Sequence, residues 1–195
     1  MSGTPPARRL FFALWPNEAQ RAALARATAK IARHSGGRPV PESNLHVTLA
    51  FLGSVPESRV AELRRIATRT GEEFPRAALP LVLTLEALAH WSKPQVLTVL
   101  ERQETHAADP GPVTALAARL TTETAAAGFS PDLKPFRAHV TVARKVSRAP
   151  RVSAMRKVEW SFDAFALVES RTLAEGPVYS VVESYPLGRA GKVGT

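Results

Sequence analysis

The chain has 195 residues, no cysteine and a formal net charge of +9, and hydrophobic residues make up 45% of it. The missing cysteine excludes disulfides, thiolate zinc sites and cysteine nucleophiles, and no apolar run is long enough for a secretory signal or a membrane span. The composition is that of a globular protein, and we expect one monomeric, cytoplasmic domain over residues 1–195, with no membrane partner.

Short runs rich in aromatic and β-branched residues, each bounded by turn residues, predict strands. Seven are expected, over residues 8–15, 45–52, 79–89, 95–102, 138–143, 158–168 and 178–185. The two ends of the chain, about 1–6 and 188–195, are small and polar, and we expect them to be flexible.

Three helices are predicted between these strands. The first covers residues 17–33 and begins at Asn17 with a capping box. The second follows a similar capping-box signature at Ser54, and the third covers residues 109–128, between an Asp-Pro start and a glycine. Because helices and strands alternate irregularly, with hairpins among them, an α+β fold is favoured over a doubly wound parallel sheet.

A short word occurs twice in the chain. HVTLA begins at His46 and returns as HVTVA at His139. Each copy follows a predicted strand and helix, so we expect two related lobes that each contribute one HVT strand to a shared groove. Because side chains alternate along a strand, His46 and Thr48 share one face, as do His139 and Thr141.

Two imidazoles and two hydroxyls around one cavity suit phosphoester cleavage. Imidazole can donate or accept a proton near neutral pH, and a threonine hydroxyl can donate a hydrogen bond to a non-bridging phosphate oxygen. Neither copy of the word contains a carboxylate, and the chain has no HExxH or CxxC motif, so we expect no metal and no cofactor. A structural role is the usual fate of a single histidine, but the matched duplication favours function.

Two arginines flank the second copy, and aromatic residues lie near the ends of predicted strands. Arg137 shares the histidine face by strand period and Arg144 lies just past Thr141, so both are candidates to bind phosphate, with a solvated position as the alternative. Phe11 and Trp91 are candidates to stack on a base, although core packing is the commoner fate of residues such as Phe11. The positive charge favours nucleic acid or a phosphorylated ligand, while a proteome rich in arginine would give the same excess.

The words NLHVTLAFLG and PFRAHVTVAR resemble the two His-x-Thr-x motifs of the two-histidine (2H) phosphoesterases. The chain as a whole is similar to the RNA 2′,3′-cyclic phosphodiesterase family, also called the 2′-5′ RNA ligases. This likeness includes the opening RLFFALWPNEAQRAAL and the closing FALVESRTLAEGPVYSVVESYPL. The resemblance implies a bilobal fold of two pseudo-symmetric lobes of antiparallel sheet, with helices outside and a central cleft.

The resemblance also implies an activity. An RNA-terminal 2′,3′-cyclic phosphate would be hydrolysed to a 2′-phosphomonoester without a metal, and reversal would join ends through a 2′-5′ linkage. His46 would be the proton donor and His139 the proton acceptor, while Thr48, Thr141 and Arg144 would hold the phosphate. Two alternatives stay open. One is a cyclic phosphate of a small nucleotide or ADP-ribose as substrate, and the other is a non-catalytic RNA-binding module with the same cleft.

Overall fold

The computed structural model describes residues 6–101, 111–151, 154–174 and 176–188. The termini predicted to be flexible lie outside these ranges, apart from Pro6 and Gly188. Both of these residues are held by backbone hydrogen bonds, because Glu57 N–H donates to the Pro6 carbonyl and Gly188 N–H donates to the Gly71 carbonyl. Within the described ranges, the chain forms nine strands and three α-helices.

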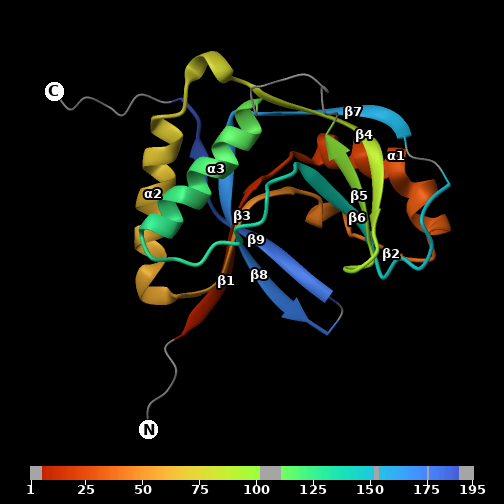
Figure 1. Cartoon of the computed structure of the whole chain (residues 1–195), viewed down its shortest axis with the longest axis horizontal. Coiled ribbons are helices and arrows are strands. Elements are labelled where there is room, and N and C mark those ends of the chain that lie inside the picture. Colours follow the sequence, from red (N-terminus) through yellow and green to blue (C-terminus); the bar gives the residue numbers. More distant parts are fainter. Residues whose placement is uncertain (1–5, 102–110, 152–153, 175, 189–195) are drawn as a thin grey trace, which may run out of the picture.

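Four strands form the first antiparallel sheet, in the order β3-β1-β8-β9. Their bounds are β1 Ala7–Leu14, β3 Val47–Pro56, β8 Ala164–Leu173 and β9 Gly176–Pro186. Helices α2 (Val60–Glu72) and α3 (Gly111–Ala126) pack against this sheet and against each other (Figure 1). The first HVT word therefore lies on an outer strand of this sheet.

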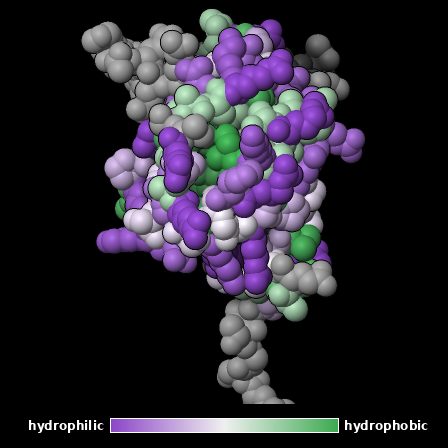
Figure 2. Space-filling view, turned by 90° about the vertical axis from the view of Figure 1, so that its right-hand side faces the viewer, coloured by the Kyte–Doolittle hydropathy of each residue, from purple (hydrophilic) through white to green (hydrophobic). Residues whose placement is uncertain are grey.

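Five strands form the second antiparallel sheet, in the order β2-β6-β5-β4-β7. Their bounds are β2 Arg38–Pro39, β4 Leu81–Trp91, β5 Val96–Glu101, β6 His139–Arg144 and β7 Ala154–Phe162. Helix α1 (Glu18–His34) packs against this sheet, and the buried Trp160 of β7 donates a hydrogen bond to the helix backbone at Gln20 (2.9 Å). Hydrophilic side chains cover most of the face on this side of the molecule (Figure 2).

The two sheets repeat one pattern. From β1 of the first sheet the chain continues through α1 and the short β2 to β3, and from β5 of the second sheet it continues through α3 to β6. In both cases the HVT strand pairs antiparallel with the strand that precedes the helix. Helix α1 packs on the second sheet and α3 packs on the first, so each helix covers the sheet to which the strand before it does not belong. The buried side chains of both sheets belong to one core. The predicted α+β fold with two related lobes is confirmed.

One predicted helix start is confirmed and one is wrong. The capping box at Asn17 is present, but Ser54 does not begin α2, because it remains in β3 and pairs with β1. The helix begins six residues later, at Val60, after a short 3-10 turn. The Asp-Pro start predicted for the third helix lies outside the described residues.

The strand predicted over residues 158–168 is two strands. The chain leaves the second sheet at the end of β7, turns at Asp163 and enters the first sheet as β8, and a backbone hydrogen bond from Leu187 to Asp163 holds the turn. Nothing in the sequence marks the change of sheet, because buried apolar side chains continue from the end of β7 into the start of β8. The two-residue strand β2 was not predicted. None of the helices described has the length and apolar character needed to span a membrane.

Candidate active site

Both HVT strands carry a β-bulge at the same place in the word. In β3 the register with β1 passes from Thr48 to Ala50, so that Leu49 has no partner. In β6 the register with β5 skips Val142 in the same way, one residue after Thr141. The repeated word therefore has a repeated backbone irregularity as well as repeated side chains.

The bulge changes which side chains reach the cavity. In a regular strand the fifth residue after each histidine would point to the opposite face. An extra residue in the strand reverses the alternation beyond it, so Phe51 and Arg144 face the same cavity as His46 and His139. These two equivalent positions differ in chemistry, since one is aromatic and the other cationic.

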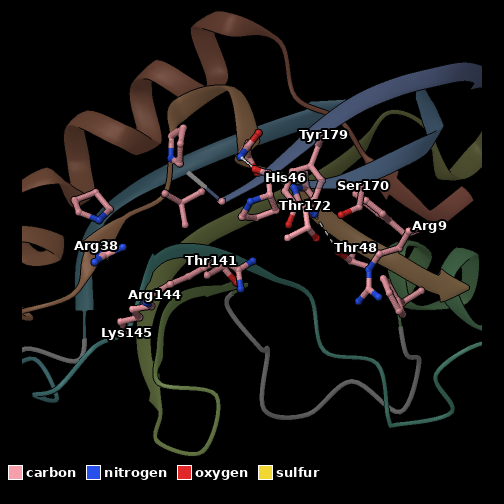
Figure 3. Close-up of a pocket in the computed structure, with 18 of the residues that line it drawn as sticks. Arg9, Arg38, His46, Thr48, Thr141, Arg144, Lys145, Ser170, Thr172 and Tyr179 are labelled. Carbon is pink, nitrogen blue, oxygen red and sulfur yellow. Dashed lines mark hydrogen bonds between the residues drawn. The ribbon is translucent and has the colours of Figure 1, made fainter. Parts of the chain in front are cut away.

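The cavity between the two sheets has a volume of about 760 Å³. The matched pairs His46 with Thr48 and His139 with Thr141 all line it, the first pair from the four-stranded sheet and the second from the five-stranded sheet. Figure 3 shows side chains from both sheets converging on this space. The structure thus brings together all four residues that the repeated word singled out.

The His46 ring is enclosed by three aromatic rings. Trp15 stacks on it (ring centroids 5.5 Å apart, 24° between planes), Phe11 lies 5.0 Å away and Tyr179 meets it edge-on at 5.0 Å. Its Nδ1 lies 2.7 Å from the Asn44 carbonyl oxygen. A carbonyl has no proton to give, so Nδ1 carries the hydrogen and donates it, and Nε2 is left to face the cavity side, 3.1 Å from the hydroxyl of Thr48.

The His139 ring is held by the same device. Its Nδ1 donates to the carbonyl of Arg137, 2.8 Å away and again two residues earlier in the chain. The Trp91 ring packs on it, with centroids 4.5 Å apart. In both copies the backbone therefore selects the tautomer and orients the ring, so that Nε2 is the nitrogen available to a ligand.

Burial lowers the pKa of both imidazoles. Desolvation is the main cause for His46 and lowers its pKa to about 4, with smaller contributions from the charges of Arg144, His139 and Arg21 against the opposing Asn44 hydrogen bond. The pKa of His139 is also lowered, chiefly by burial. In the free protein at neutral pH, both rings are therefore uncharged, and a bound anion would favour their protonated forms.

We expect His46 to titrate near pH 4 in the free protein and at a higher pH with inorganic phosphate bound, because an anion beside the ring stabilises imidazolium. The folded pKa lies below that of the unfolded chain, about 6.5, so the stability gained from the neutral ring is lost as pH falls from 6.5 toward 4. Nitrogen-15 NMR of the imidazoles, assigned with His46→Gln, measures this. A titration near 6.5 that phosphate leaves unmoved would contradict it.

The other predicted site residues are placed as follows. Arg144 is exposed and lines the cavity. Arg137 is exposed but does not line the cavity, and its contact with the site is through its carbonyl. Phe11 is 3% exposed, lines the cavity and packs beside His46, whereas Trp91 packs on His139 and is not part of the lining.

Sequence reasoning missed several polar and aromatic residues of the lining. They are Arg9, Arg38, Phe51, Lys145, Ser170, Thr172 and Tyr179. The repeat itself could have indicated Phe51, because Phe51 follows His46 in the sequence by the same number of positions as Arg144 follows His139. Among the residues described, no group of histidine and carboxylate side chains is placed to hold a metal ion.

Over most of its length, the chain is similar to known phosphoesterases. The family described as LigT-like phosphoesterase matches residues 14–98 and 105–179. The RNA 2′,3′-cyclic phosphodiesterase of Thermus thermophilus is 33% identical over 92% of this chain and 90% of that protein, and the Escherichia coli protein of the same name is 31% identical over 73% and 74%.

Solved structures show the same similarity. Escherichia coli LigT in complex with 3′-AMP superposes with a TM-score of 0.80 at 27% identity, over 93% of this chain and 99% of that one. A Thermus thermophilus structure superposes with a TM-score of 0.74 at 31% identity, over 92% and 98%.

Proposed function

Because the chain belongs to the LigT-like phosphoesterase family, we propose that it hydrolyses a 2′,3′-cyclic phosphate at the end of an RNA to a 2′-phosphomonoester. The observation that carries this proposal is the cavity between the two sheets, where each sheet presents one imidazole and one threonine hydroxyl. The relatives named RNA 2′,3′-cyclic phosphodiesterase support the reaction class. We further propose that the protein acts as a cytoplasmic monomer.

The two histidines are proposed to divide the proton transfers. Nε2 of His139 accepts a proton from water as the water oxygen bonds to phosphorus. The bond from phosphorus to the 3′ oxygen breaks, and Nε2 of His46 gives that oxygen its proton. Donor and acceptor are assigned by the family resemblance, while the hydrogen bonds of Nδ1 to backbone carbonyls support Nε2 as the reacting nitrogen in both rings.

The role proposed for His46 requires a proton that the free protein holds only at low pH, since the pKa of His46 is about 4. The negative charge of the bound phosphodiester raises that pKa and so couples protonation to substrate binding. The hydroxyls of Thr48 and Thr141 are proposed to donate hydrogen bonds to the non-bridging oxygens, and the Arg144 guanidinium to balance their charge. Arg137 is the weaker candidate because its side chain lies outside the lining.

A small nucleotide remains the second candidate substrate, on one observation. Structures of Escherichia coli LigT hold 3′-AMP, NADP⁺ or ATP, and this chain is 27% identical to that protein. A cavity of about 760 Å³ is in the range of pockets that bind small molecules.

The proposed reaction is tested with a short RNA that ends in a 2′,3′-cyclic phosphate, incubated with EDTA. We expect complete conversion to a product whose phosphate is on the 2′ oxygen, as phosphorus NMR and chromatography against 2′- and 3′-phosphate standards report. A 3′-phosphate product would contradict the assignment of the leaving oxygen. Absence of turnover, with the protein folded, would contradict the RNA substrate and leave the nucleotide candidates to be assayed in the same way.

A further inference from the structure

The two ends of the cavity differ in charge. At one end lie Arg38, Arg144 and Lys145, and at the other end Arg9 is the cation, with its guanidinium over the Phe51 ring at 4.7 Å (Figure 3). The reacting pairs of histidine and threonine lie between these ends. A substrate that extends beyond the reacting phosphate would therefore meet a cluster of cations in one direction and an aromatic surface with one cation in the other.

The fold gathers the three cations from two distant segments. Strand β2 pairs with β6 so that Arg38 is directly opposite Arg144, although the two residues are far apart in the sequence. Lys145 follows at once, at a backbone φ of +55°, a conformation that a residue other than glycine rarely adopts. The close approach of β2 depends on Gly37, where a Cβ atom would lie 2.8 Å from the carbonyl oxygen of Arg144.

No carboxylate among the described residues neutralises this cluster. Arg38, Arg144 and Lys145 are exposed, and in the described part of the chain none of them takes part in an ion pair. The described lining of the cavity contains no aspartate or glutamate. Other surface arginines of this chain, such as Arg59 and Arg69, do have carboxylate partners. Like charges held side by side repel, and a bound anion relieves that repulsion.

We propose that Arg38 and Lys145, on either side of Arg144, form a subsite for the phosphodiester on the 5′ side of the terminal nucleotide, so that an oligonucleotide end is preferred to a mononucleotide. This inference rests on the proposed function. Arg144 is the member of the cluster proposed to reach the reacting phosphate, and its charge acts on His46. Arg38 lies opposite Arg144 on the neighbouring strand and Lys145 follows it in the chain, so these two cations are placed to bind the next phosphodiester of a flexible single strand.

Two substrates separate the subsite from the reacting centre. One is a nucleoside 2′,3′-cyclic monophosphate, which has no 5′ phosphodiester, and the other is a trinucleotide that ends in the same nucleoside 2′,3′-cyclic phosphate. We expect wild-type kcat/KM to be higher for the trinucleotide. Arg38→Ala and Lys145→Ala are each expected to lower the ratio of trinucleotide to mononucleotide kcat/KM by roughly three- to tenfold, mainly through KM. The salt dependence for the trinucleotide should weaken by about 0.7 in log–log slope for each cation removed.

Lys30→Ala is the matched control. It removes the same charge from an exposed position on α1 outside the cavity lining, so it should leave the substrate ratio at the wild-type value. Equal wild-type kcat/KM for the two substrates, or a loss in the variants no larger than in Lys30→Ala, would overturn the subsite. If wild type turned over neither substrate, the proposed function would fail, and fluorescence anisotropy with a labelled trinucleotide 2′-phosphate would still decide the subsite, because Arg38→Ala and Lys145→Ala should weaken its binding.

Discussion

His46→Ala and His139→Ala are each expected to lower kcat for a 2′,3′-cyclic phosphate end by about 10²–10⁴-fold, and the double variant is expected to be little worse than either single one. The two imidazoles line one cavity, with Nδ1 of each bound to the backbone and Nε2 left as the nitrogen for proton transfer, and the proposed reaction needs a donor and an acceptor in the same step. Once one proton transfer is lost, the second histidine has little left to contribute. Single-turnover rates with saturating protein measure the chemical step directly.

His34→Ala is the matched control, because His34 is exposed near the end of α1 and does not line the cavity. Its rate should equal that of wild type. Removal of the His46 ring leaves a space among three aromatic rings, so thermal unfolding of each variant must accompany the kinetics. Losses in folded variants that are small, and that multiply in the double variant, would refute a paired acid and base.

The sequence predicted the catalytic candidates more completely than it predicted their surroundings. The alternation of side chains placed His46 with Thr48 and His139 with Thr141, and the structure has both pairs in one cavity. The same rule put Arg137 on the histidine face, where its side chain does not reach the lining. It gave no means of knowing that a bulge turns Arg144 toward the histidines, because a bulge is a property of the pairing of two strands and not of one strand alone.

The aromatic residues show a second limit. Phe11 and Trp91 were predicted as stacking surfaces for a base; in the structure both pack against the imidazoles, and Phe11 also lines the cavity, so base stacking by these residues stays a prediction. An aromatic residue near a polar site has the same pattern in either role, and only its partner in space distinguishes them. Arg38 was missed because its strand has two residues and its partner follows about a hundred positions later. Short strands have no periodicity from which to predict them.

Thr48→Val and Thr141→Val are each expected to lower kcat by about 10²–10³-fold with little change in KM, because each hydroxyl is proposed to donate a hydrogen bond that strengthens as charge develops on the phosphate. Valine keeps the branched shape and removes only the hydroxyl. Thr48→Ser and Thr141→Ser, which keep a hydroxyl, should recover most of the rate. Thr68→Val, at an exposed position on α2, is the control for a threonine outside the cavity.

The two threonine variants should differ in their pH dependence. The Thr48 hydroxyl lies 3.1 Å from Nε2 of His46, whereas Thr141 makes no side-chain hydrogen bond among the residues described. In the neutral ring Nε2 accepts from that hydroxyl, so loss of the Thr48 hydroxyl removes a partner of the neutral form and should shift the kcat/KM profile toward higher pH. Thr141→Val should lower the whole profile without moving it. Identical pH profiles for the two variants would contradict this, and would mean that Thr48 acts only on the phosphate while burial alone sets the pKa of His46.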